Sequence, residues 1–122
     1  MKTLNRVTIV GLLGQDPVIK QHGELKLAEL NIATDSKKKD KDGNLQKSAD
    51  WHKVKVFSPY ALDYTVSKLK KGDLVLIEGS LKTNVWKDKN EITRYDTDIV
   101  VSNQDTVGLL REAIEKKIVT QK

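Results

Sequence analysis

Residues 49–57, ADWHKVKVF, bring aromatic and basic side chains together at alternate positions. Side chains point alternately to the two faces of a β-strand, so this segment is predicted to be a strand with two different faces. One face carries Trp51, Lys53, Lys55 and Phe57. The other face carries His52, Val54 and Val56. We expect the valine face to turn inward and the aromatic and basic face to meet solvent.

A second segment, DLVLIEGSLKTNVW at residues 73–86, repeats this combination. Alternation predicts an inward face formed by Val75, Ile77, Leu81 and Val85. The outward face is predicted to carry Glu78, Ser80, Lys82, Asn84 and Trp86. Lys82 and Trp86 therefore add a further cation and a further aromatic ring to the candidate site.

Aromatic rings interleaved with lysines suit the binding of a single-stranded nucleic acid. Unpaired bases stack on aromatic rings, at about 1–3 kcal/mol per base, and cations along the same path attract the phosphates. A duplex hides its bases, so the pattern favours unpaired strands and needs no readout of base sequence. The structural alternative is that the tryptophans pack at a subunit interface or beneath a loop.

The residue content argues against catalysis and against a metal or cofactor site. The chain has no cysteine, which excludes a disulfide framework, a thiol nucleophile and cysteine-ligated zinc. His22 and His52 lie far apart and form no HExxH motif, and GLLGQD lacks the lysine of a P-loop. We therefore expect a binding protein without a cofactor rather than an enzyme.

The length and charge set broad limits. The 122 residues suffice for one domain, and a net charge of +5 gives modest support for a polyanionic partner. No apolar run approaches the roughly 18 residues of a membrane span, so no membrane partner is expected. The start, MKTLNRVTIVGLLG, is predicted to be a first strand, because Asn5, Arg6 and Thr8 interrupt the apolar stretch of a signal peptide.

The order of predicted elements is that of an OB-fold. Strands are expected at residues 4–13, 25–34, 49–57, 73–86 and 92–101, with a helix after Ser58-Pro59 that ends at Gly72. One short helix between the third and fourth of five strands predicts a five-stranded OB-fold barrel of the all-β class. A simple meander sandwich is the alternative.

Apolar positions indicate how these elements pack. The core-facing positions of the first two strands are predicted to be Val7, Ile9, Leu13, Ala28, Leu30 and Ile32, and those of the helix Leu62, Val66 and Leu69. Residues 35–48, DSKKKDKDGNLQKS, lack periodicity and are predicted to be a flexible, lysine-rich loop with a turn at Asp42-Gly43. Residues 105–119 are predicted to form a closing helix.

Four segments in this order resemble the bacterial and mitochondrial single-stranded DNA-binding protein (SSB) family. They are LNRVTIVGLLGQDP, ADWHKVKVF, LKKGDLVLIEGSLKTNVWKD and YDTDIVV, which together span about residues 4–101. The resemblance implies an OB-fold, a homotetramer, and sequence-independent binding and protection of single-stranded DNA in DNA replication, recombination and repair. It implies no catalysis and no cofactor.

The resemblance also assigns roles to single positions. Base-stacking aromatics of the family match Trp51, Phe57 and Trp86, and basic contacts to the DNA backbone match Lys53, Lys82 and Lys71. Lys55, on the same strand face, and Arg6, in the N-[RK]-V start, complete the predicted nucleic-acid-binding set. His52 matches a residue of the subunit interface.

The chain departs from the family in three places. The loop after the second predicted strand reads SKKKDK where many bacterial members have another stacking tryptophan, and Asn84 and Val85 replace more basic residues. The chain ends IEKKIVTQK instead of in a long acidic tail, which puts recruitment of replication and repair proteins in doubt. We expect an OB-fold domain at residues 1–104 and an extension at residues 105–122.

Three alternatives stay open from the sequence. The start without an Arg-rich presequence favours the bacterial cytoplasm, at the nucleoid, whereas the lack of an acidic tail favours the mitochondrial matrix. An OB-fold module for RNA or for a primosome is the main functional alternative, because no residue announces a contact to a 2′-hydroxyl. A protein-interaction module whose aromatic face binds another protein is the other.

Overall fold

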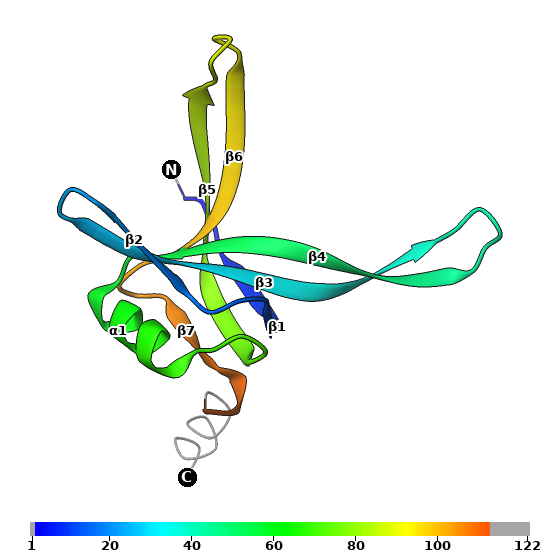
Figure 1. Ribbon diagram of the computed structural model, residues 1–122, viewed down its shortest axis with the longest axis horizontal. Helices are drawn as coiled ribbons and strands as arrows, with labels where there is room; N and C mark the ends of the chain where they lie inside the picture. Colours follow the sequence, from blue (N-terminus) through cyan, green and yellow to red (C-terminus); the bar gives the residue numbers. More distant parts are fainter. Residues whose placement is uncertain (1, 113–122) are drawn as a thin grey trace.

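The computed structural model describes residues 2–112, and Figure 1 shows their arrangement. The elements are β1 (Val7–Leu13), β2 (Val18–His22), β3 (Leu25–Lys39), β4 (Leu45–Val56), α1 (Pro59–Lys68), β5 (Leu74–Lys87), β6 (Thr93–Val101) and β7 (Thr106–Leu109). In this part of the chain, no helix has the length and apolar character needed to cross a membrane.

The strands form one closed sheet. Its order is β1-β3-β4-β6-β5, and β5 pairs with β1 again, so five strands make a barrel. All of these pairings are antiparallel except that of β4 with β6, which joins residues 54–56 to residues 99–101. The helix α1 lies between the third and fourth barrel strands, β4 and β5. The predicted OB-fold barrel is therefore confirmed, and the meander sandwich is wrong.

Alternating residues fill the barrel with a single hydrophobic core. Its buried members include the predicted positions Leu13, Ala28, Leu30, Ile32, Val54, Val56, Val75 and Ile77. Val7 and Ile9 are partly buried against the same core. The period-two pattern thus identified the inner face of β1, β3 and β4 correctly, because the barrel is closed over these residues.

The barrel closes at β1, because this strand pairs with two different strands along its length. β1 pairs with β5 along residues 7–12 and with β3 at residues 12–13. A Cβ atom on Gly11 would lie 2.5 Å from the carbonyl oxygen of Ala33, which no side chain tolerates. Gly11 therefore allows β1 and β3 to approach closely enough to close the sheet.

The helix α1 covers one end of the barrel along a narrow stripe. Ser58 caps its N-terminus by accepting the Ala61 N–H at 3.5 Å. The buried positions are Leu62, Thr65 and Leu69, whereas Val66 is exposed, so the predicted stripe was wrong at Val66. A short helix contacts the barrel at i, i+3 and i+7, and position i+4 falls on the edge of that stripe.

The end of α1 also differs from the prediction. The helix stops at Lys68, and Leu69 is already extended, although Gly72 was expected to end the helix. Gly72 instead adopts a φ of 93° in the turn before β5, which suits a residue without a Cβ. Its N–H donates to the Leu13 carbonyl oxygen at 2.8 Å, so this turn is fastened to the end of β1.

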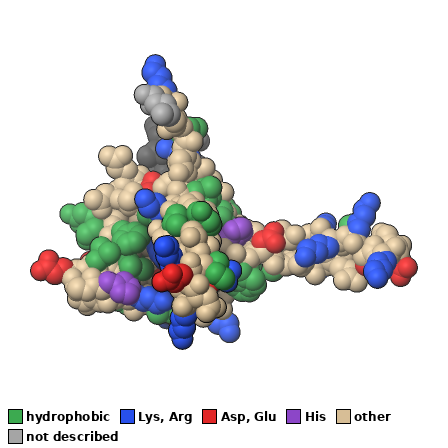
Figure 2. All heavy atoms as spheres, turned by 90° about the horizontal axis from the view of Figure 1, so that it is seen from above, with side chains coloured by type: hydrophobic (Ala, Val, Ile, Leu, Met, Phe, Trp, Pro, Cys, Tyr) green, Lys and Arg blue, Asp and Glu red, His purple; other side chains and the backbone are tan. Residues whose placement is uncertain are grey.

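The lysine-rich segment 35–48 is a β-hairpin and not the predicted loop. β3 and β4 remain paired from Ala28–Val56 out to Lys39–Leu45, and only residues 40–44 form the turn. The Asp40 carboxylate holds this turn by accepting the N–H groups of Asp42 and Asn44. Figure 1 shows the hairpin as an arm that leaves the barrel, and Figure 2 shows lysine side chains spaced along it among acidic ones.

A second arm is formed by β5 and β6. Beyond the barrel rim none of residues 2–112 covers the inner face of β5, so Leu81 and Val85 are 48% and 62% exposed. Their predicted place in the core was therefore wrong, although the alternation itself continues along the strand. Figure 1 shows this arm pointing away from the barrel in a different direction from the first.

Two short strands were not predicted. All residues of β2 are exposed, so this strand on the edge of β3 has no alternation to detect. β7 pairs with residues 75–78 of β5, which replaces the start of the helix expected from Asp105. Residues 110–112 are helical, and the rest of that predicted helix lies outside the described residues. The division at residue 104 stays a prediction, although β7 belongs to the same sheet.

Matched substitutions in β5 test this division between core and arm. We expect Val75→Ala to lower the free energy of unfolding by about 2 kcal/mol, because it removes buried methyl groups and leaves a cavity. Val85→Ala removes the same atoms from an exposed site and should change stability by about 0.5 kcal/mol or less. Urea unfolding measures both, and equal losses would contradict the exposed arm.

Candidate nucleic-acid interface

The predicted aromatic and basic face of β4 is confirmed. Trp51 is 62% exposed and Lys53 is exposed, whereas Val54 and Val56 are fully buried. Phe57 directly follows β4, and its N–H donates to the Val101 carbonyl oxygen at 2.9 Å. The strand therefore presents its rings and cations outward because its valines fill the barrel.

Two further strands extend this face. The parallel pairing of β4 with β6, and the pairing of β6 with β5, bring Lys82, Asn84 and Asp98 next to Lys55. The Lys55 Nζ lies 2.9 Å from Asp98 Oδ2, and the Asn84 Nδ2 donates to the same oxygen at 3.2 Å. We call these three side chains the Lys55–Asp98–Asn84 bridge. Asp98 is only 5% exposed, whereas Lys55 is half-buried and Asn84 is exposed, so the bridge is buried at its carboxylate and open to solvent at its amide.

The bridge lies between two hollows, each of which includes one aromatic ring. One hollow, of about 450 Å³, is lined by Trp51, Lys53, Lys55, Asn84, Asp96, Thr97 and Asp98. The other, of about 290 Å³, is lined by Lys55, Phe57, Ser80, Leu81, Lys82, Asn84, Asp98 and Val100. All three bridge residues line both hollows. The structure thus brings together Trp51, Phe57, Lys53, Lys55 and Lys82 of the predicted set.

Trp51 rests on a glycine. A Cβ atom on Gly14 would lie 2.3 Å from Cζ3 of the Trp51 ring, so only glycine leaves room for the ring in this position. Gly14, Gln15 and Asn31 line a further hollow along the same ring. No local sequence pattern reports this contact, because it depends on the pairing of β3 with both β1 and β4.

Trp86 lies on the β5–β6 arm, on the side of the strand that carries Asn84. Its indole Nε1–H donates to Asp96 Oδ2 at 2.7 Å, and the ring is 46% exposed. Asp96 also lines the hollow beside Trp51, which connects the two tryptophans across one surface. Neither Asp96 nor Asp98 was predicted as a site residue. Their roles depend on the register of β5 with β6, in which Asp96 lies opposite Asn84.

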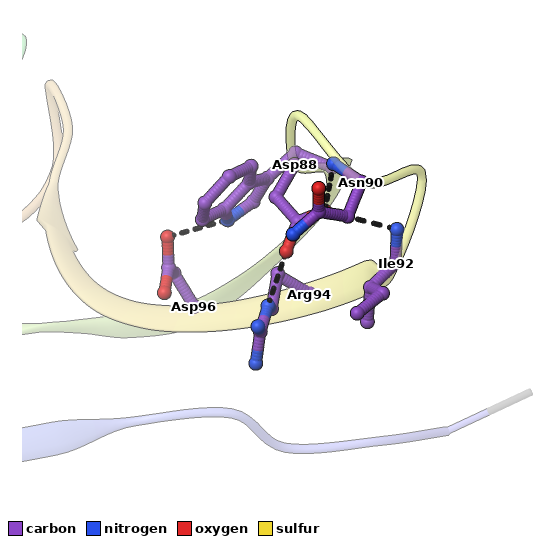
Figure 3. Close-up of polar contacts among 6 residues, drawn as sticks. Asp88, Asn90, Ile92, Arg94 and Asp96 are labelled. Carbon is purple, nitrogen blue, oxygen red and sulfur yellow. Dashed lines mark hydrogen bonds and ion pairs between the residues drawn. The ribbon is translucent and has the colours of Figure 1, made fainter.

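The tip of this arm is held by one carboxylate. Asp88 accepts the N–H groups of Asn90 and Ile92 at 2.9 and 3.0 Å, and the Arg94 Nε lies 3.0 Å from it, as Figure 3 shows. The hydrogen bond from Ile92, together with those from Arg94 and Asn90, holds the pKa of Asp88 below its usual value. Asp88 in this turn therefore stays ionised to a lower pH than an aspartate without these hydrogen bonds.

The other predicted residues lie away from the two hollows. The exposed Lys71 sits in the turn before β5, where its N–H donates to Asp16 Oδ1 at 2.9 Å. Arg6 is exposed just before β1 and lines neither hollow. His52 is half-buried on the opposite face, with its Nε2 2.9 Å from Thr34 Oγ1. Within residues 2–112, no group of three or more acidic or histidine side chains is placed to hold a metal ion.

The contact between Gly14 and Trp51 can be tested in a chain in which Trp86→Phe leaves Trp51 as the single tryptophan. We expect Gly14→Ala to preserve the fold and to shift the fluorescence emission of Trp51 to longer wavelength, because the added Cβ forces the ring away from residue 14 and into solvent. Gly108→Ala is the control, since its Cβ would make only an ordinary contact, 3.6 Å from Tyr64. Unchanged emission after Gly14→Ala would contradict the contact between Gly14 and the Trp51 ring.

Comparison with known proteins identifies the family. Residues 4–107 match the sequence profile of the Single-strand binding protein family. A single-stranded DNA-binding protein of Xylella fastidiosa is 37% identical over 106 residues, which cover 86% of this chain and 64% of that protein. The solved structure described as "Plasmodium falciparum SSB complex with ssDNA" is 30% identical, with a TM-score of 0.78, and the match covers 90% of this chain and 97% of that chain. The chain therefore belongs to the single-strand binding protein family.

Proposed function

We propose that this protein binds and protects single-stranded DNA. The observation that carries the proposal is the exposure of Trp51 and Trp86 on one surface that spans β4, β6 and β5. Soluble proteins usually cover such large rings, and unpaired bases are partners that stack on them at about 1–3 kcal/mol each. The names of the Xylella and Plasmodium proteins support the same ligand.

In this proposal, aromatic rings bind the bases and cations bind the phosphates. Bases stack on Trp51, Phe57 and Trp86, while Lys53 and Lys82 attract the phosphates between them. Lys71 and Arg6 lie outside the hollows, so they contact the DNA backbone only where the strand continues beyond them. The lysines of the β3–β4 arm offer a further track of the same charge.

The proposed role is binding without catalysis, in DNA replication, recombination and repair, as the family implies. Nothing in this role requires a cofactor. The bacterial relative supports the bacterial cytoplasm over the mitochondrial matrix as the location.

We also propose that the chain assembles into a homotetramer. Leu12 and Leu74 lie opposite each other on the outside of the barrel, and they and Val10 are 43–51% exposed. Another copy that covers this apolar patch would remove it from water. His52, on the face away from the two hollows, is the residue that the resemblance places in a subunit contact.

Light scattering tests the assembly. We expect a molar mass about four times the 13.8 kDa of one chain, and a lower mass for Leu12→Glu, because a charge in the patch opposes its burial. Lys20→Glu, on the exposed strand β2, is the control and should keep the wild-type mass. A wild-type protein with the mass of one chain would refute the homotetramer.

Tryptophan substitutions test the proposed stacking. We expect Trp51→Ala and Trp86→Ala each to weaken binding of oligo-dT by about 1–3 kcal/mol, because each removes one stacking surface while the core stays intact. Fluorescence anisotropy of labelled oligo-dT measures the affinity. The dependence of affinity on salt should stay nearly the same, since the lysines are unchanged.

Tyr60→Ala is the matched control, since Tyr60 is a more exposed aromatic residue on α1, away from both hollows. It should bind oligo-dT as the wild type does. Oligo-rU of equal length, added as a competitor, separates the DNA proposal from the RNA alternative. Wild-type affinity in both tryptophan variants would exclude stacking as the source of binding.

A further inference from the structure

Asn5 makes two hydrogen bonds to one residue of the β5–β6 arm. Its Nδ2 donates to the Leu81 carbonyl oxygen at 2.8 Å, and the Leu81 N–H donates to the Asn5 Oδ1 at 2.9 Å. Two residues that face each other on antiparallel strands exchange the same pair of bonds through their backbones. The amide side chain of Asn5 therefore takes the place of a strand partner for Leu81.

The register of β1 with β5 shows where this contact lies. The pairing runs from Leu12–Leu74 to Val7–Gly79, and two residues further along it would join residue 5 to residue 81. β1 begins only at Val7, so the backbone of residue 5 lies outside the sheet. The Asn5 side chain thus supplies the hydrogen bonds of the residue pair at which β5 passes from the barrel into the arm.

The arm is tied to the barrel through both of its strands. β6 is held by its parallel pairing with β4 and by the contact of Lys55 with Asp98. Among residues 2–112, β5 beyond Gly79 pairs only with β6, and Asn5 bonds to the opposite edge of β5 at Leu81. A two-stranded ribbon is only marginally stable by itself. We therefore expect two ties to fix the direction of the arm, whereas one tie would let it swing.

We propose that Asn5 is a positioning residue, which bonds to Leu81 to fix the direction of the β5–β6 arm and thereby holds Trp86 in a set position relative to Trp51. The inference rests on the proposed binding of single-stranded DNA. A DNA strand that stacks on both rings binds more tightly when the rings already stand in place, because binding then orders less of the protein. Leu81 also lines the hollow beside Phe57, so the same contact keeps one wall of that hollow in place.

Two spin labels measure the direction of the arm. The chain has no cysteine, so labels attach only at Lys89→Cys, on the tip of the arm, and at Ser67→Cys, on α1, two exposed positions. Double electron–electron resonance gives the distribution of the distance between them, and refolding with an excess of unlabelled chain limits the signal to pairs within one subunit. We expect Asn5→Ala to broaden this distribution. Asn5→Leu, which is similar in size but can neither donate nor accept, should broaden it as much.

Binding of oligo-dT measures what the fixed arm contributes. We expect Asn5→Ala to weaken binding roughly 3- to 10-fold, because the affinity falls with the fraction of chains whose arm points in the competent direction. In a Trp86→Ala chain the arm has no tryptophan left to position, so the same substitution should weaken binding there by less than about 2-fold. A merely structural role of Asn5 would weaken binding equally in both chains.

Asn103→Ala is the control, since it makes the same change of side chain in the turn between β6 and β7, outside both hollows. It should leave the distance distribution and the affinity for oligo-dT unchanged. Circular dichroism reports whether each variant is folded, and Asn5→Leu decides alone if Asn5→Ala is not.

The outcomes separate this inference from the function on which it rests. An unchanged distance distribution in the Asn5 variants would refute the inference and leave the function standing. The same holds for a broader distribution with wild-type affinity, or for an equal loss of affinity with and without Trp86. If the wild type does not bind oligo-dT, the proposed function fails and the inference with it. A broader distribution, together with a loss of affinity that depends on Trp86, would establish Asn5 as the residue that positions the arm.

Discussion

The short parallel pairing of β4 with β6 is the constraint on which the rest of the surface depends. It joins three residue pairs, at residues 54–56 and 99–101, and it closes the barrel. The same three pairs place Asp98 beside Lys55 and bring β5 within reach of β4. Without this pairing the rings of β4 and of β5 would belong to separate hairpins. Closure of the core and assembly of the proposed DNA-binding face therefore depend on the same three residue pairs.

The arms are the second consequence of the barrel. β3, β4, β5 and β6 all continue beyond the rim, where one face of each strand loses the core that it covered. A two-stranded ribbon in water is only marginally stable, so each arm has a turn fixed by a carboxylate, Asp40 or Asp88. The arms expose residues such as Val85 and the lysines of residues 37–47 to a partner. The two arms thus contribute little to the stability of the protein, and they enlarge the surface that is available for binding.

Features that depend on a single strand were predicted from the sequence, whereas features that depend on the pairing of two strands were missed. Alternation within residues 49–57 gave the correct faces of Trp51 and Val54, because periodicity is a property of one strand. The arm at residues 35–48 was missed because both of its faces are polar, which leaves no period to detect. Gly14 and Asp98 were missed for a different reason. Their partners, Trp51 and Lys55, lie on other strands, and no local pattern reports the register that joins them.

The Lys55–Asp98–Asn84 bridge has a cost in hydration free energy that its charges must offset. An ion pair with a buried carboxylate and a half-buried lysine adds little net stability, because the loss of hydration offsets the attraction between the charges. A pair of hydrophobic side chains would fill the same space at no electrostatic penalty against DNA. The pair does supply fixed positions: one oxygen of Asp98 holds both Lys55 and Asn84 where the two hollows meet. A surface made only for charge would not need such an arrangement, whereas a surface with two separate hollows requires a fixed partition between them.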